Sequence, residues 1–205
     1  MPAAPEAPRA RPPRGMDEAL IDLIPVQGEW DVAGYLWLSE LRPRLVEFVD
    51  GHIEVPPMPG DHHQTILGRL WESLTAHART TGGKALMAPM PMRTIQERFR
   101  EPDLMFLRRS DDPRRGKHFW TGADLVVEIV SPTGRNRDIV DKRAEYAATG
   151  IPEYWIIDPD DETVTVLALN GDVYVVRTVF RPGDMAEAAT LPGFTVDVSA
   201  LLAED

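Results

Sequence analysis

The sequence predicts a mixed α/β domain in which a central β-sheet is flanked by helices and extended by β-hairpins. Three observations predict it: apolar runs of strand length, longer segments with apolar residues at helical spacing, and two dipeptides, Asp50-Gly51 and Asn170-Gly171, that favour hairpin turns. At 205 residues the chain has the length of one domain with a substantial core. We expect residues 16–205 to form that domain.

The N-terminal half is expected to combine two helices with short strands. The first helix is predicted over Trp30–Leu41, where leucines recur at helical spacing. Asp61 opens the second, with Gln64 three residues later in a variant of the capping box, and Thr81-Gly82-Gly83 ends it. The predicted strands of this half are 44–49, 52–55, 84–87, 91–96 and 103–108.

A βαβ unit is predicted in the C-terminal half. The strand Asp124–Val130 is apolar on both faces, which is typical of a strand buried between two layers. A helix over Asn136–Thr149, closed by Gly150, connects it to the strand Glu153–Asp158, and such a crossover is nearly always right-handed. A last hairpin is predicted from the strands 163–169 and 173–180.

Composition narrows the kinds of site and surroundings that are possible. The chain has no cysteine, which excludes disulfides and thiolate metal sites and makes a reducing cytoplasm the expected location. Its longest apolar stretches, such as Ile151–Ile157, are far shorter than a membrane span, so we expect a soluble protein without a membrane partner. Residues 1–15 are rich in proline and arginine and lack the apolar segment of a signal peptide, which predicts a disordered tail.

Charge is distributed unevenly along the chain. The net charge of −11 argues against a broad electrostatic coating of nucleic acid. Residues 93–143 nevertheless hold 12 of the 22 basic residues against 9 acidic ones, whereas residues 144–205 hold 2 against 12. Basic runs in loops are usually only solvated. Here, however, they lie near Asp103 and Glu128, the two acids of the candidate site described below, and would suit phosphate contacts. The residues in question are Arg114, Arg115, Lys117, Arg135 and Arg137.

Two carboxylates mark the candidate site. Glu128 interrupts an apolar strand, where an ionised carboxylate is costly unless a cation or hydrogen-bond donors compensate it. Asp103 stands at the start of another apolar strand. If the strands are antiparallel neighbours with Arg108 opposite Ala123, Asp103 lies opposite Glu128 and the two carboxylates converge. Such a pair suits Mg²⁺ or Mn²⁺, which leave positions free for a phosphate and support hydrolysis.

A lysine on the following helix is the third candidate. Asp138, Lys142 and Tyr146 occur at intervals of four and share one helix face, from which side chains lean toward the end of the preceding strand. Lys142 could there stabilise charge on a phosphate or orient a water molecule. A surface ion pair between Asp138 and Lys142 is an equally good interpretation. Tyr146 is more often a core residue.

At these residues the chain resembles the Uma-two family of restriction endonucleases, within the PD-(D/E)XK superfamily. The resemblance covers about Trp30 to Phe180, and each block alone would be weak evidence. The blocks are Val46–Ile53, Asp61-His62-His63, Glu101-Pro102-Asp103, Asp124–Pro132, Asp138 with Lys142 and Tyr146, and Gly150–Pro159. The resemblance implies a restriction-endonuclease-like core in which Asp103 and Glu128 bind the metal.

The resemblance also implies roles for other residues. The superfamily's usual lysine lies two residues after the glutamate, where this chain has Val130, so we assign that role to Lys142. Glu47 matches an acid on the family's first hairpin and could be a further metal or water ligand, although on most hairpins such a side chain faces solvent. His63 and Asp138 are expected to be accessory to the site.

The expected function is that of a metal-dependent endonuclease hydrolysing phosphodiester bonds of DNA. A nuclease-fold protein that has lost turnover and acts as a nucleic-acid or protein binding module is the alternative, favoured by Val130 and the acidic composition. A phosphoesterase acting on small substrates is a third possibility. We expect a homodimer, because two-fold assemblies are common and suit double-strand cleavage. No base-reading element is visible, so the target sequence is not predicted.

Overall fold

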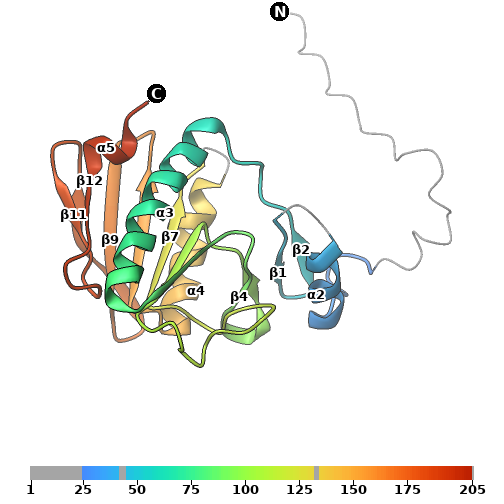
Figure 1. The fold of residues 1–205 in the computed structure, drawn as a ribbon. Coiled ribbons are helices and arrows are strands. Elements are labelled where there is room, and N and C mark those ends of the chain that lie inside the picture. The colour runs from blue at the N-terminus through green and yellow to red at the C-terminus, as the bar shows by residue number, and fades with distance from the viewer. Residues whose placement is uncertain (1–24, 42–44, 132–133, 205) are drawn as a thin grey trace, which may run out of the picture.

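A six-stranded mixed sheet forms the centre of the protein and confirms the predicted fold class (Figure 1). The computed structural model describes residues 25–41, 45–131 and 134–204. The predicted tail, residues 1–15, lies outside them. The sheet has the order β10-β9-β8-β7-β6-β3. Its strands are β3 (Lys84–Met87), β6 (Leu104–Leu107), β7 (Leu125–Ile129), β8 (Glu153–Asp158), β9 (Thr163–Asn170) and β10 (Val173–Phe180).

The pairing of the central strands agrees with the sequence-based prediction. β6 is antiparallel to β7 with Leu104 opposite Val127, which is the register that brings Asp103 opposite Glu128. β7 is parallel to β8, and the connection runs through the helical segments η2 (Arg137–Asp141) and α4 (Lys142–Thr149), as expected of a βαβ unit. The other pairs in this sheet are antiparallel.

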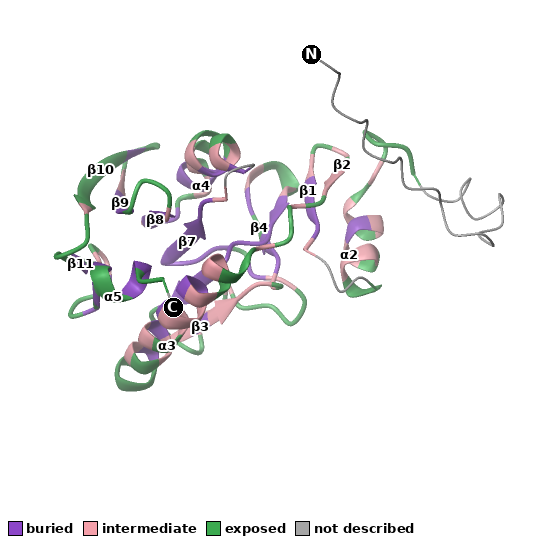
Figure 2. Cartoon of the chain, turned by 90° about the horizontal axis from the view of Figure 1, so that it is seen from above, coloured by how far each residue is buried: buried purple, intermediate pink, exposed green. Residues whose placement is uncertain are grey.

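Helices cover both faces of this sheet. On one face, α3 (Asp61–Thr81) buries leucines such as Leu70 against β6 and β7, because alternate strand residues point to that side. On the other face, Tyr146 of α4 packs with Val126. β7 is buried along its whole length (Figure 2). The segments β11 (Met185–Glu187), β12 (Thr195–Asp197) and α5 (Val198–Leu202) extend the α3 side.

A smaller antiparallel sheet lies beside the main one and has the order β2-β1-β5-β4. Helix α2 (Val32–Leu41) packs Tyr35 against Phe48 and Phe99 of this sheet. The strand predicted over 91–96 is shorter, because Gln96 has a positive φ of 53° inside a 3₁₀ turn, η1 (Ile95–Glu97). The strands are β1 (Glu47–Val49), β2 (His52–Glu54), β4 (Met92–Arg93) and β5 (Phe99–Arg100).

The ends of α3 agree only partly with the prediction. The helix begins at Asp61, but the predicted capping box is wrong: Gly60 is the N-cap, and its carbonyl accepts the N–H of Gln64. The C-terminal end has Gly82 in the left-handed conformation, as a helix stop favours. Among the described helices, none is long and apolar enough to cross a membrane.

Candidate active site

The two predicted carboxylates lie at one end of the main sheet. Asp103 precedes β6 and Glu128 lies in β7, so the register places them side by side on neighbouring strands. Both are buried, with 9% of Asp103 and 4% of Glu128 exposed. Both line a cavity of about 50 Å³, which has room for a small cation or a few water molecules.

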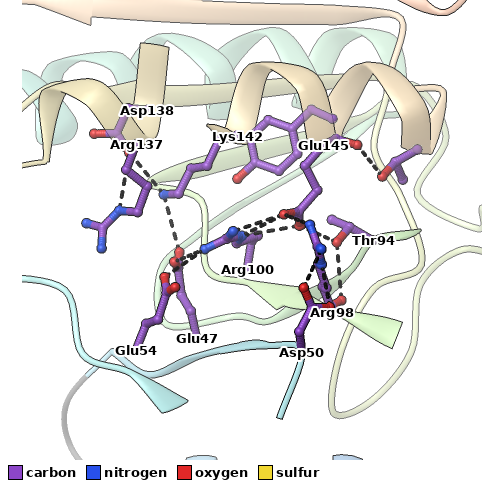
Figure 3. Close-up of polar contacts among 12 residues, drawn as sticks. Glu47, Asp50, Glu54, Thr94, Arg98, Arg100, Arg137, Asp138, Lys142 and Glu145 are labelled. Atoms are coloured by element: carbon purple, nitrogen blue, oxygen red, sulfur yellow. Dashed lines mark hydrogen bonds and ion pairs between the residues drawn. The ribbon is translucent and has the colours of Figure 1, made fainter. Parts of the chain in front are cut away.

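Lys142 is at the centre of a buried cluster of acids. Its Nζ lies 2.9 Å from Oε1 of Glu128, 3.2 Å from Oε1 of Glu47 and 3.3 Å from Oδ1 of Asp138 (Figure 3). Burial by itself would lower the pKa of Lys142, but the three carboxylates outweigh burial and raise that pKa above its ordinary value. The ammonium is therefore charged. Because Asp138 and Lys142 are both buried, the interpretation as a surface pair is wrong.

The helix that delivers Lys142 begins with an irregular turn. Residues Arg137–Asp141 form a π-helix before α4, where the sequence predicts a plain α-helix. Wider turns of this kind are frequent at functional sites. The turn keeps Asp138, Lys142 and Tyr146 on the face that meets β7. Tyr146 is more than a core residue, because its hydroxyl donates to Oε1 of Glu128 over 2.6 Å.

Two carboxyls of this cluster have opposite proton affinities. Burial raises the pKa of Glu128 to about 8, assisted by the negative charges of Asp138 and Asp103 and opposed by Lys142. Burial also acts to raise the pKa of Glu47, but Lys142 and Arg100 outweigh it and lower that pKa to about 2. Around neutral pH, Glu47 is therefore ionised, whereas Glu128 readily takes up a proton.

Glu47 does not face solvent. Solvent exposure, which is usual for such a side chain on a hairpin, was the alternative to a role in the site. None of its side chain is exposed, because the smaller sheet turns this face of β1 toward α4. Its Oε1 also accepts the backbone N–H of Glu101 over 3.3 Å. The structure thus brings Glu47 to the same cluster as Glu128 and Lys142.

Asp103 is held by two donors from different elements. Its Oδ2 accepts the backbone N–H of Ile129 over 2.7 Å and lies 3.3 Å from Nε2 of His63, which stands in the first turn of α3. Burial alone would lower the pKa of His63, but its contact with Asp103 raises it above the ordinary value. Nδ1 of His63 is buried without a hydrogen-bond partner among the described residues. His63 therefore belongs to the wall of the site.

Arg137 is the one predicted phosphate-contacting residue that lines this cavity in the described part of the chain. Its nearest carboxylate is that of Asp138, 3.9 Å from Nε. That Nε is buried and has no hydrogen-bond partner among the described residues. The guanidinium is therefore weakly neutralised and can accept an anionic partner.

The other four predicted phosphate-contacting residues lie outside the cavity lining: Arg114, Arg115, Lys117 and Arg135. Aspartates neutralise two of them: Arg114 pairs with Asp112 and Asp124, and Arg135 pairs with Asp158 and Asp161. Arg115 donates to the carbonyl of Ser110, and Lys117 lines a separate cavity beside α2. Compensated in this way, Arg114 and Arg135 offer little net charge to a phosphate.

A second buried ion network, which was not predicted from the sequence, lies next to the cluster. Its centre is Arg100, which contacts Glu47, Glu54 and Glu145 (Figure 3). The available signal was that Glu145 follows Lys142 by three residues and therefore faces the same way. Arg100 gave no such signal, because its partners lie far away in the sequence.

The donor chemistry of the site fits a small divalent cation. No group of three or more His, Asp or Glu residues in the described part of the chain is spaced to hold a metal ion. Asp103 and Glu128 nevertheless offer two adjacent carboxylates that open on a cavity. Mg²⁺ often takes one or two carboxylates and completes its shell with water and substrate oxygens. Two ligands are therefore sufficient.

A protein-family model, Uma2, described as "Putative restriction endonuclease", matches residues 34–199. The chain belongs to the Uma2 family. This confirms the predicted resemblance, and the matched range includes every residue of the cluster around Lys142. None of the curated proteins compared with the chain matches it.

A solved structure shares the fold of this Uma2 chain. It is the crystal structure of "a putative nuclease belonging to DUF820" from Anabaena variabilis ATCC 29413. The TM-score is 0.65 at 20% sequence identity, and the alignment covers 82% of this chain and 96% of the other. At this identity the likeness concerns the fold.

The lysine that contacts Glu128 in this Uma2 chain lies on a helix. Val130, two residues after Glu128, is buried in the core that includes Tyr146. Lys142 reaches Glu128 from α4, with Nζ 2.9 Å from the carboxylate. The ammonium thus lies next to the carboxylate although Lys142 is 14 residues beyond Glu128 in the sequence.

Proposed function

We propose that this Uma2 protein is a metal-dependent endonuclease that hydrolyses phosphodiester bonds of DNA. The observation that supports it is the burial of Asp103, Glu128 and Lys142 around one cavity. Two acids and one ammonium buried together are costly for stability and useful for chemistry on a phosphate.

Asp103 and Glu128 would hold the cation, Mg²⁺ or Mn²⁺. When bound, such an ion polarises a phosphoryl oxygen and lowers the pKa of an attacking water molecule. The protein donors described above reach Oδ2 of Asp103 and Oε1 of Glu128. A ligand can therefore approach through the other oxygen of each carboxylate, while the contacted oxygens keep the side chains fixed.

Lys142 and Arg137 would act on the phosphate. The Lys142 ammonium has three N–H donors and three carboxylate oxygens within 3.3 Å, so it must exchange one of these contacts to reach a substrate oxygen. In that position it stabilises the charge that develops on the scissile phosphate. Arg137, with its buried Nε unpaired among the described residues, would bind a phosphate oxygen at the cavity. His63 would orient Asp103.

A plasmid-nicking assay with Mg²⁺ or Mn²⁺ tests the proposal. The wild-type protein should nick the plasmid, and Glu128→Gln and Lys142→Ala should abolish nicking. Arg143→Ala is a matched control, because Arg143 is the next residue on α4 but donates to the carbonyl of Tyr174, away from the cavity. Equal nicking by all variants would trace the activity to a contaminant and contradict the proposal.

The second candidate function is that of a nuclease-fold protein that binds nucleic acid or protein but does not cleave it. It is favoured by the saturation of Lys142 with protein carboxylates and by the net charge of −11. It predicts that wild-type protein retains labelled DNA in a binding assay and gives no product over long incubation. Metal-dependent hydrolysis of nucleotides without hydrolysis of polymers would instead indicate a small-substrate phosphoesterase.

A further inference from the structure

Arg100 is the centre of a buried ion network directly beside the Lys142 cluster. Only 3% of the residue is exposed. Its Nη1 donates to Oε2 of Glu47 over 2.9 Å and to Oε2 of Glu54 over 3.0 Å. Its Nε and Nη2 donate to the carboxylate of Glu145 over 3.2 and 2.9 Å (Figure 3). One guanidinium therefore joins strands β1, β2 and β5 to helix α4.

Glu47 connects this network to the site. Its Oε2 accepts from Arg100, and its Oε1 lies 3.2 Å from Nζ of Lys142. Because the side chain is fully buried, water cannot replace either partner. Arg100, together with the backbone N–H of Glu101 on Oε1, therefore fixes the position of the oxygen that meets Lys142.

Glu145 makes a second connection. It lies on α4 three residues after Lys142, so its contact with Arg100 fixes the rotation of the helix that carries the lysine. Thr94 supports Glu145 by donating to the same carboxylate. Both connections end at the ammonium that touches Glu128.

We propose that Arg100 is a positioning residue of the endonuclease site, which acts through Glu47 and Glu145 to hold the ammonium of Lys142 against Glu128. The inference rests on the proposed function. Arg100 does not line the cavity that carries Asp103 and Glu128, so its action is indirect.

A role in stability alone does not account for this network. Buried ion networks can often be replaced by packed apolar residues with little loss of stability, because desolvation offsets the attraction. An apolar residue in place of Arg100, however, could not neutralise the carboxylates of Glu47 and Glu145. Without Arg100, the buried charge of Glu47 would draw Lys142 away from Glu128, while the only ion pair left to Glu145 among the described residues would be its longer contact of 3.5 Å with Arg98. Because the Arg100 guanidinium neutralises Glu47, the Lys142 ammonium can remain in contact with Glu128.

Steady-state DNA cleavage by full-length Arg100 variants tests the inference. Arg100→Met should lower kcat by about 10- to 100-fold, the usual effect of losing a residue that orients an active-site group, with KM changed less than about twofold. Arg100→Lys should be intermediate, because lysine keeps the charge but lacks the planar fork that reaches several carboxylates. Arg143→Met is the control and should match the wild type. Far-UV circular dichroism checks that each variant is folded.

A double-mutant cycle separates positioning from a general structural role. If Arg100 acts through Glu47, Arg100→Met should lower kcat less than about threefold further in a Glu47→Gln background. Additive losses, or an unchanged kcat in folded Arg100→Met, would overturn the inference while leaving the proposed function intact. If Arg100→Met does not fold, Glu145→Gln, which keeps the shape but not the charge, takes its place with the same expected loss. A wild-type protein that cleaves no nucleic acid would refute the proposed function, and this inference with it.

Discussion

Lys142 shows how a single buried charge can hold several residues in place. Its ammonium compensates Glu47, Glu128 and Asp138, all of which are buried. The pKa values of Glu47 and Glu128 differ although both carboxyls are buried. Arg100, together with Lys142, supports the ionised form of Glu47, whereas burial and the negative charges of Asp138 and Asp103 outweigh Lys142 at Glu128.

Lys142→Met should strongly destabilise the protein at neutral pH. Loss of the ammonium leaves buried carboxylates uncompensated, and breaking a buried pair in this way costs about 3–5 kcal/mol. The stabilisation is fully present at pH 7, which lies below the ordinary pKa of lysine, about 10.4. Urea unfolding of both proteins at pH 7 and pH 5 measures it. The deficit should shrink at pH 5, where protonation relieves the carboxylates, and equal midpoints at pH 7 would contradict the expectation.

Glu101→Gln should change how stability depends on pH. Burial raises the pKa of Glu101 from 4.5 to about 8, although its carboxylate accepts the N–H of Val46. Between these values the folded state keeps a proton that the unfolded state has lost, so this group makes stability fall as pH rises from about 4.5 to 8. Glutamine has no such proton. Relative to wild type, Glu101→Gln should therefore gain on the order of 1–3 kcal/mol at pH 8 compared with pH 5 in urea unfolding. A constant difference at both pH values would contradict this.

At the scale of elements, the site forms where three parts of the fold meet: the strand pair β6–β7, the β1–β2 hairpin and the helical segment η2–α4. The register of β6 and β7 places the two candidate metal ligands side by side, and the β1–β2 hairpin supplies Glu47. The helical segment η2–α4 brings Lys142, with a π turn that no propensity argument predicts. Such a turn is tolerated where tertiary contacts hold it, here the hydrogen bond from the Tyr154 hydroxyl to the carbonyl of Asp138 and the ion pair between Lys142 and Glu128.

Two glycines with similar backbone angles should respond differently to alanine. Gly51 and Gly150 both have a φ of +80°, so each alanine costs about 1–2 kcal/mol in strain. A Cβ on Gly51 would also lie 2.6 Å from the carbonyl oxygen of Gly28, whereas one on Gly150 would meet no atom within 4 Å. Gly51→Ala should therefore lower Tm more than Gly150→Ala in calorimetry. Equal losses would show that the hairpin can shift away from Gly28.

At the scale of the whole molecule, charge is arranged to limit the number of phosphates that can be bound. Arg114 and Arg135 are neutralised by aspartates, and the chain carries a net charge of −11. Arg137 is available at the cavity. Affinity for DNA should thus depend mainly on the site and only weakly on long-range attraction.

DNA binding should accordingly show a shallow salt dependence. Fluorescence anisotropy with Glu128→Gln, in which cleavage is expected to be abolished, should give a slope of log K against log [salt] below about 3 in magnitude, corresponding to about three phosphates. Arg137→Ala should reduce the slope by about 1. A slope of about 6 or more would mean that a larger basic surface engages the duplex.

Light scattering tests the expected homodimer. Double-strand cleavage needs two copies of a centre that cuts one strand, and two-fold pairs are the commonest assemblies. The measured mass should be twice the 22.9 kDa of one chain. A mass of one chain across the concentrations used for cleavage would exclude the dimer and limit the protein to nicking.

The sequence by itself determined the strands of the main sheet and the pairing of the central ones. Apolar runs predicted β6 and β7, and the isolated acids Asp103 and Glu128 marked the site. The register expected if these strands were antiparallel neighbours is the one observed. Spacing of four residues put Lys142 on one helix face with Asp138 and Tyr146, and the structure decided between the site and a surface ion pair. These features are local, because the spacing of apolar residues along a short segment predicts both its secondary structure and its buried face.

Only the tertiary structure decided what surrounds that site. Arg100 meets Glu47 and Glu145 across 53 and 45 residues of sequence, and no periodicity encodes such contacts. Glu47 is fully buried because a second sheet packs against α4, which its own strand could not reveal. Packing of distant layers, rather than local pattern, selects which charges are buried together, and those charges then set the proton affinities of the site.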